Sequence, residues 1–193
     1  ANAVGAMAKD KRITLSSHVT ADVGTVMTDP EKLERITLNL IFNALKFTAA
    51  NGRVDFNART EDEWLVVDVK DTGMGIPADQ LPHIFGRFWQ ADTSSQRKFQ
   101  GMGIGLGLVK ELAEAQGGSV SATSEVGKGT TMTVRLPLTR PTAADLAEAE
   151  VKDEHHDPAE HPEGMQKDWI ADLYRRAELF PAMTSLQATL NPV

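Results

Sequence analysis

The stretch from residue 29 to residue 48 carries the strongest structural signal in the chain. Asp29 can accept hydrogen bonds from the free backbone N–H groups of a first helical turn, and Pro30 fits that turn because it needs no N–H there. Apolar residues then recur at spacings of three and four, the pattern of a helix with one buried face. They are Leu33, Ile36, Leu40, Ala44 and Phe47. Such a stripe has to be covered, so the rest of the chain must supply a second layer.

Two predicted hairpins supply that layer. Residues 54–58 and 64–69 form one, joined by the short link 59–63, and residues 119–124 and 130–136 form the other. Both pairs of runs are short and are bounded by turn residues, as strands are. The helix and the hairpins together therefore favour helices packed on a sheet.

Weaker signals complete the order of elements. Strand patterns occur at residues 13–17 and 23–27, and a short helix is predicted near residues 78–85. A further helix follows the glycine-rich run 101–107. The resulting order predicts an α/β (α+β) two-layer sandwich, in which a mixed, mostly antiparallel sheet carries helices on one face.

Charge divides the chain into two parts. Residues 1–139 hold 16 acidic and 15 basic side chains, whereas residues 140–193 hold 11 acidic and 5 basic ones. A neutral body with an acidic extension argues against a nucleic-acid partner, which would require clustered Lys and Arg. We expect one domain in residues 1–139, an acidic, proline-containing linker in 140–165, an amphipathic helix in 166–181 that can lead to a further domain, and a tail in 182–193.

The sequence has no cysteine, which excludes disulfides and cysteine-based zinc sites. No apolar run approaches the roughly 20 residues that a membrane-spanning helix needs. The expectation is a cytoplasmic piece without a membrane segment, whose parent protein can still be anchored in a membrane.

Asn39, Asn43 and Lys46 form the first candidate site cluster. Their spacings of four and three place them on one face of the predicted helix, beside its apolar stripe. Amide oxygens are hard ligands that suit Mg²⁺, and an ammonium can contact phosphate. A solvated helix face is the alternative interpretation of these three residues taken alone.

Asp71, Gly73 and Gly75 form the second cluster, at the end of the strand predicted at 64–69. Glycines let the backbone approach a flat ligand closely, and a carboxylate can accept a hydrogen bond from an exocyclic amine. Met74 and Ile76 can line an apolar pocket beside it. An ordinary Asp–Gly turn after a strand is the alternative.

Glycines at positions 101, 103, 105 and 107 precede a helix and form the third cluster. Free amides at a helix N-terminus bind anions, so residues 101–105 would enclose a phosphate chain. A dinucleotide-binding fingerprint fits poorly, because the spacing differs and a polar loop rather than a strand comes first.

Aromatic and basic residues between positions 84 and 98 predict a lid. The aromatic ones are Phe85, Phe88 and Trp89. The basic ones, which could reach phosphates, are Arg87, Arg97 and Lys98. A packing role alone is the favoured interpretation of Phe85.

Taken in this order, the motifs resemble the catalytic and ATP-binding domain of sensor histidine kinases. The wider superfamily also holds gyrase-type, heat-shock-chaperone and mismatch-repair ATPases. The resemblance covers roughly residues 10–138 and implies the Bergerat-type ATP-binding fold. The matching motifs are residues 39–48 (N box), 71–77 (G1 box), 84–88 (F box), 101–106 (G2 box), and 117–118 with 127–130 (closing hairpin).

The resemblance also implies ATP and Mg²⁺ as ligands and assigns roles by position. Asn43 would be the main magnesium ligand, helped by Asn39, and Lys46 would contact phosphate, so that Asn43 and Lys46 are the catalytic candidates. Asp71 would bind the adenine amino group. The other nucleotide-binding candidates are Phe47, Gly73, Gly75, Ile76, Phe88, Arg97, Gly101, Gly103, Ile104, Gly105, Leu106 and Thr130.

The implied activity is transfer of the γ-phosphoryl group to a histidine on a separate dimerisation domain, with a response regulator receiver domain as the downstream partner. Asn39 stands where the family's hydrolytic relatives place a catalytic glutamate, which favours transfer over hydrolysis. Met102 stands where the family often has threonine. The acceptor histidine has no match among the chain's histidines, which are His18, His83, His155, His156 and His161. A serine kinase of the anti-sigma type and a nucleotide-binding regulatory module without transfer activity are the alternatives.

Overall fold

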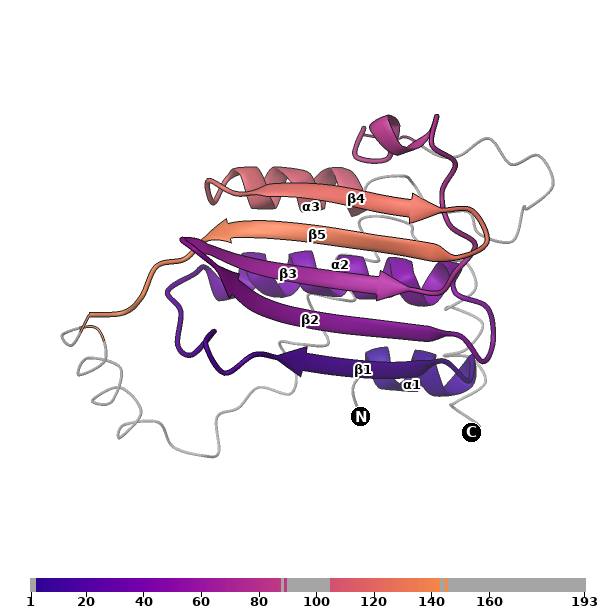
Figure 1. Cartoon of the computed structure of the whole chain (residues 1–193), viewed down its shortest axis with the longest axis horizontal. Coiled ribbons are helices and arrows are strands. Elements are labelled where there is room, and N and C mark those ends of the chain that lie inside the picture. Colours follow the sequence, from indigo (N-terminus) through magenta and orange to yellow (C-terminus); the bar gives the residue numbers. More distant parts are fainter. Residues whose placement is uncertain (1–2, 88, 90–104, 143–144, 146–193) are drawn as a thin grey trace, which may run out of the picture.

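The computed structural model describes residues 3–87, 89, 105–142 and 145. A five-stranded sheet in the order β1-β2-β3-β5-β4 carries the helices on one face (Figure 1). Strands β1 and β2 are parallel, and the other neighbours are antiparallel. The predicted fold class is therefore confirmed. The elements are α1 (Ala3–Asp10), β1 (Thr14–Val19), α2 (Pro30–Phe47), β2 (Arg53–Glu61), β3 (Trp64–Asp71), the 3-10 turn η1 (Leu81–His83), α3 (Gly105–Glu114), β4 (Ser119–Glu125) and β5 (Gly129–Pro137).

Helix α2 begins and ends as its sequence predicts. The Asp29 carboxylate accepts from the Lys32 N–H at 3.0 Å, which satisfies one free donor of the first turn. At the other end the Thr48 N–H donates to Ala44 O at 3.0 Å. Within the predicted apolar stripe, Ile36, Leu40 and Ala44 are buried in the core, whereas Phe47 at its end is 40% exposed. Burial of this stripe fixes how α2 lies across the sheet.

The core lies between α2, α3 and the inner face of the sheet. Strand residues at alternate positions point into it, as the pleat requires. The buried apolar ones include Val54, Leu65, Val67, Val69, Val134 and Leu136. Helix α2 therefore packs over β2 and β3, and α3 packs over β4 and β5, while the end of β3 lies next to the start of β5.

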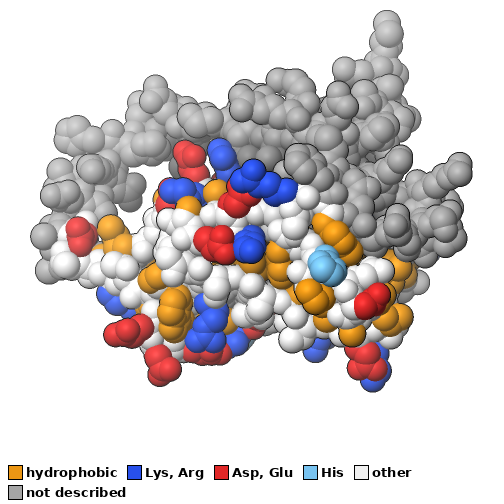
Figure 2. Space-filling view, turned by 90° about the horizontal axis from the view of Figure 1, so that it is seen from above, with side chains coloured by type: hydrophobic (Ala, Val, Ile, Leu, Met, Phe, Trp, Pro, Cys, Tyr) orange, Lys and Arg blue, Asp and Glu red, His pale blue; other side chains and the backbone are white. Residues whose placement is uncertain are grey.

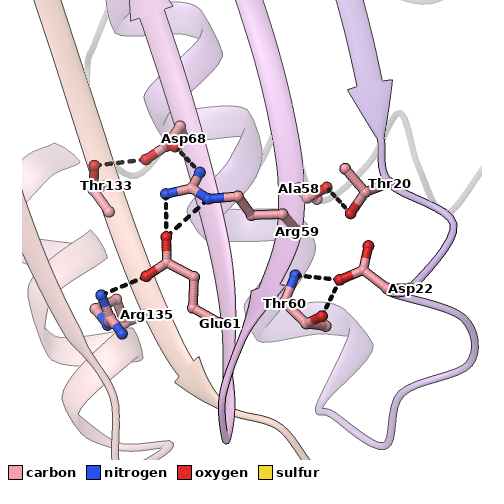
Figure 3. A network of polar contacts seen from close by, with 9 residues as sticks. All are labelled: Thr20, Asp22, Ala58, Arg59, Thr60, Glu61, Asp68, Thr133 and Arg135. Atoms are coloured by element: carbon pink, nitrogen blue, oxygen red, sulfur yellow. Dashed lines mark hydrogen bonds and ion pairs between the residues drawn. The ribbon is translucent and has the colours of Figure 1, made fainter.

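The outer face of the sheet carries a polar network instead of helices (Figure 3). Arg59 bonds the carboxylates of Glu61 and Asp68, and Arg135 donates to Glu61 at 2.9 Å. The hydrogen bonds to Asp68 and Glu61 hold the pKa of the Arg59 guanidinium above its ordinary value. The fully buried Val66 pairs with Arg59 on one side and Arg135 on the other, so the arginine stems shield it.

The strand predicted at residues 23–27 does not form. Only Met27 makes a β-bridge, to Thr139, and Gly24 has a positive φ of 52° that interrupts an extended run. The guanidinium of Arg140 binds backbone carbonyls of this segment and takes the place of a neighbouring strand. These carbonyls belong to Asp22, Val23 and Thr25.

Three further elements differ from expectation. Helix α1 was not predicted, although its Val4 and Ala8 are buried in the core. The helix expected near residues 78–85 is only the turn η1, and the link of the first hairpin is shortened to residues 62–63. The predicted linker, amphipathic helix and tail fall almost wholly outside the described residues. Within the described part of the chain, no helix is long and apolar enough to cross a membrane.

Candidate functional site

Asn39 and Asn43 lie where the start of α3 crosses α2. The Asn39 amide nitrogen donates to Arg35 O at 2.7 Å, which fixes the orientation of the amide. A Cβ placed on Gly105, the first residue of α3, would lie 3.1 Å from Asn39 Oδ1 and 3.6 Å from Asn43 Nδ2. Two of the predicted clusters therefore meet: the amide-bearing face of α2 touches the glycine start of α3, whose amides can bind an anion.

Asp71 ends β3 and is only 7% exposed. Asp71 Oδ1 accepts from the Gly73 N–H at 2.7 Å and from the Thr130 N–H at 3.3 Å. Burial raises the pKa of Asp71 above its ordinary value, and these two hydrogen bonds partly offset the rise. Backbone donors from two separate segments thus orient the carboxylate through one of its oxygens.

Gly73 and Gly75 allow the turn after Asp71 to fit between α2 and the second hairpin. A Cβ on Gly73 would lie 2.6 Å from Phe47 O at the end of α2. Gly75 has a φ of 72°, and a Cβ there would overlap the Glu125 carbonyl. The close approach predicted for these glycines occurs against the protein's own backbone, and it locks the turn in place.

Ser124 joins the same turn to the second hairpin and was missed from the sequence. The Ile76 N–H donates to Ser124 Oγ at 2.8 Å, and the Ser124 hydroxyl donates to Gly129 O at 2.9 Å. Thr130 Oγ1 lies 2.9 Å from Ser124 Oγ. A serine in an alternating strand gives no local sign of such a role, because its partners come from two other segments.

Lys46 and Phe47 occupy the last turn of α2, beside the Asp71 turn. Lys46 Nζ lies 5.0 Å from the centroid of the Phe47 ring, and burial lowers the pKa of this lysine. Phe47 is 40% exposed and Met74 is 42% exposed. The Met74 N–H donates to Phe47 O at 3.4 Å, so both side chains belong to one corner of the site. This corner offers apolar surface to a flat ligand and a cation to an anion.

The described part of the lid packs against α3. Arg87 Nε donates to Glu111 Oε1 at 2.6 Å, so the structure directs this arginine to a carboxylate. Phe85 packs against the core, as predicted, and also lines a hollow with His83 and Trp89. Figure 2 looks onto this edge of the molecule and shows hydrophobic side chains gathered on part of it, beside charged ones.

Several predicted site residues lie outside the described residues. They are Phe88, Arg97, Gly101, Gly103 and Ile104. Of the remaining candidates, Ile76 and Leu106 are partly buried against the core. The residues that the structure brings together are Asn39, Asn43 and Gly105 on one side, and Phe47, Asp71, Gly73, Gly75 and Thr130 on the other.

The donors in this site suit a hard cation held together with a ligand. Among the described residues, no group of three or more His, Asp or Glu side chains could enclose a metal ion by itself. The side-chain oxygens of Asn39 and Asn43 are the hard donors beside the α3 start, and two amides supply only part of the six ligands that Mg²⁺ takes. The residues therefore fit an ion that also binds waters and phosphate oxygens.

Comparison with known proteins identifies the family. The sequence profile of the histidine kinase-, DNA gyrase B- and HSP90-like ATPases matches residues 28–140. This chain belongs to that family. An uncharacterised sensor-like histidine kinase of Rhizobium meliloti is 41% identical over 138 residues, which cover 72% of this chain and 26% of the relative. The circadian input-output histidine kinase CikA of Synechococcus elongatus is 42% identical over 109 residues, covering 56% of this chain and 14% of the relative.

Solved structures of histidine kinase-type ATPases share the fold. ShkA, solved at full length in complex with AMPPNP, has a TM-score of 0.64 and 32% identity, over 72% of this chain and 28% of that one. The catalytic domain of the histidine kinase ThkA has a TM-score of 0.60 at 20% identity, over 70% of this chain and 85% of that one, and shows the fold alone. This chain spans about a quarter or less of each curated relative named above. The predicted family is confirmed.

Proposed function

We propose that this domain binds Mg-ATP along α2 and transfers the γ-phosphoryl group to a histidine on a separate dimerisation domain. The observation that carries the proposal is a pair of contacts at the two ends of one ridge of α2, which runs from Asn39 to Phe47. Gly105 of α3 lies against Asn39 and Asn43, and Gly73 of the Asp71 turn lies against Phe47 O. The similarity to ShkA, which was solved with AMPPNP, supports an adenine nucleotide as the ligand.

The spacing of these contacts suits a nucleotide with its phosphate chain. Asn39 and Phe47 are eight residues apart, about 12 Å along the helix at 1.5 Å per residue. One end of this ridge offers a helix start that can bind an anion, and the other offers a buried carboxylate beside apolar surface. We therefore place the phosphates near α3 and the base near Asp71.

At the base, Asp71 accepts a hydrogen bond from the exocyclic amine of adenine. Its carboxylate is already oriented by the N–H groups of Gly73 and Thr130, so little ordering is needed on binding. Phe47 and Met74 contribute exposed apolar surface in the same corner. Thr130 and Ser124 hold the turn against the second hairpin.

At the phosphates, Asn43 is the main magnesium ligand and Asn39 assists it, while Lys46 contacts a phosphate oxygen. When bound, the magnesium ion neutralises phosphate charge and orients the chain. Partial burial of Lys46 strengthens its attraction to an anion, because fewer waters screen the charge. The protein thus positions and neutralises groups and supplies no nucleophile of its own.

The acceptor in this proposal is a histidine imidazole, which attacks the γ-phosphorus while ADP leaves. Relatives named as sensor histidine kinases support this class of reaction. Asn39 in place of the glutamate of hydrolytic relatives supports transfer over hydrolysis. The downstream partner is a response regulator receiver domain, and the site of action is the cytoplasm, where the parent protein can be anchored to a membrane.

The proposal includes a division of the chain into a domain and three further segments. Residues 1–139 form the catalytic domain, and 140–165 form an acidic linker. In this proposal, residues 166–181 are an amphipathic helix that can lead to a further domain or dock on this one, and 182–193 are a tail; both lie outside the described residues. The family match, which ends at residue 140, supports the first of these boundaries.

Phosphotransfer labelling tests the proposed function. The chain alone with γ-labelled ATP should stay unlabelled, because none of its histidines has the acceptor setting. Addition of the dimerisation domain of its parent kinase should give an acid-labile phosphate on that domain. A dimerisation domain with its acceptor histidine replaced by glutamine is the control and should remain unlabelled. Self-labelling, or an acid-stable phosphate on the partner, would overturn the proposal and favour a serine kinase.

A further inference from the structure

Lys11 connects helix α1 to the last turn of α2. Its backbone N–H donates to Met7 O at 3.1 Å, so Lys11 directly continues the α1 helix. Its side-chain Nζ donates to Leu45 O at 2.6 Å, to Lys46 O at 3.0 Å and to Thr48 O at 3.3 Å. One side chain therefore fastens the end of α1 to carbonyl groups that lie more than 30 residues further along the chain, at the end of α2.

The chemistry of this contact is that of a helix C-terminal cap. The last four carbonyl groups of a helix have no partner within it and carry partial negative charge. An ammonium has three donors, and here the three reach three different carbonyl oxygens. Hydrogen bonds from a charged donor are stronger than neutral ones, so the contact resists displacement.

The turn that Lys11 holds is the one that carries part of the proposed nucleotide site. Lys46 and Phe47 belong to it, and Phe47 O lies 2.6 Å from the position of a Cβ on Gly73. Any shift of this turn would therefore move the proposed phosphate ligand, the apolar corner and the Asp71 turn together.

Backbone contacts near Lys11 reinforce the same connection. The Asn51 N–H donates to Arg12 O at 3.1 Å, and the Thr14 N–H donates to Gly52 O at 2.9 Å. The link between α1 and β1 is thus tied to the link between α2 and β2. Helix α1 and the end of α2 form one connected unit at this corner of the molecule.

We propose that Lys11 is a positioning residue through which the placement of α1 sets the affinity of the nucleotide site. A displacement of α1 that breaks the three bonds would release the turn of Lys46 and Phe47 and weaken nucleotide binding. The inference rests on the proposed function, because it takes the groups on this turn to be ligands of the nucleotide.

Calorimetric titration of the chain with Mg-AMPPNP tests this role. Lys11→Met keeps the apolar stem of the side chain, one atom shorter, and removes its donors, and it should weaken binding about tenfold or more, since bonds from a charged donor are lost. Lys11→Arg retains donors and should restore most of the affinity. Lys9→Met, at an exposed position on α1, is the matched control and should bind as the wild-type chain does.

The outcomes separate positioning from simple stabilisation. If Lys11→Met lowers the unfolding temperature but binds with wild-type affinity, or if Lys11→Arg binds no better than Lys11→Met, the inference is overturned. If Lys11→Met fails to fold, Lys11→Gln and Lys11→Arg test the inference instead. The variant that retains more hydrogen-bond donors must then bind Mg-AMPPNP more tightly. Absence of binding by the wild-type chain would refute the proposed function first, and the inference with it.

Discussion

Asp71 combines burial with two backbone hydrogen bonds, and both properties bear on how it would select a ligand. Its oxygen accepts from the N–H groups of Gly73 and Thr130, which leaves the carboxylate pointing in one direction. A site built to pair with a particular donor rejects ligands that lack it far more strongly than an apolar pocket can. Asp71 is therefore the residue that should make the site prefer adenine.

The raised pKa of Asp71 predicts how binding depends on pH. Because burial raises its pKa, Asp71 becomes protonated at a higher pH than an ordinary aspartate does. Affinity for Mg-AMPPNP should fall as pH decreases through this raised pKa. Asp71→Asn should bind about tenfold more weakly at neutral pH and lose this dependence. The exposed Asp79→Asn is the control and should keep the wild-type profile in calorimetry at several pH values.

The same pKa gives the sign of the effect on stability. A carboxyl group whose pKa is raised by folding contributes stability below its ordinary pKa, and this contribution is lost as pH rises through the folded value. Asp71→Asn should therefore unfold at an equal or higher temperature than the wild-type chain at neutral pH, with a smaller difference in acid. A clear loss of stability at neutral pH in thermal melts would contradict this account of the buried carboxylate.

Asn43 predicts the metal dependence of binding. Asn43→Ala should leave the affinity for AMPPNP unchanged without Mg²⁺ and remove most of the increase that Mg²⁺ gives, because a hard oxygen ligand is lost. Titrations with Mg²⁺ and with a chelator directly measure the ratio of the two affinities for AMPPNP. Asn57→Ala, on the opposite face of the sheet, is the control. If Asn43→Ala retains the full increase in affinity with Mg²⁺, the ion must bind to other residues.

Among the elements, the second hairpin holds the Asp71 turn through Gly129. This residue has a φ of 115°, and a Cβ there would overlap the Asp71 carbonyl. Gly129→Ala should lower the free energy of unfolding by about 3 kcal/mol or more, because the first residues of β5 must move away from β3. Denaturant unfolding measures the loss.

Gly127 in the same hairpin offers a matched control. Its φ is 79°, but no atom lies within 4 Å of the position of an added Cβ. Gly127→Ala should therefore cost about 1 kcal/mol, from backbone strain alone. Equal losses for the two variants would show that the contact between Gly129 and Asp71 is not what holds the turn.

The elements also show what the sequence could predict. Helix α2 and both hairpins follow from local periodicity and from turn residues, so they were found with nearly correct bounds. The segment 23–27 was predicted wrongly, because Arg140 from the far end of the domain occupies its carbonyls. Lys11 and Ser124 were missed for a related reason: each acts on backbone groups of distant segments, which leave no pattern in the sequence around it.

At the scale of the whole molecule, the sheet brings segments that are far apart in sequence to one end of α2. Because β3 pairs with β5, Asp71 lies beside the start of β5 and its Thr130. Helix α3 then sets Gly105 against the middle of α2. The ordered motifs of the sequence contain these segments, but the sequence alone could not place them relative to one another in space. The central claim is therefore that a single ligand is long enough to contact both Asn39 and the Asp71 turn.

Calorimetric titration with two nucleotides tests that claim most directly. The wild-type chain should bind Mg-AMPPNP, and the corresponding guanine nucleotide should bind about tenfold more weakly or worse. Guanine presents a carbonyl at the position where adenine has the amine that donates a hydrogen bond to Asp71 in this proposal. No heat with Mg-AMPPNP, or equal affinities for the two nucleotides, would contradict the account.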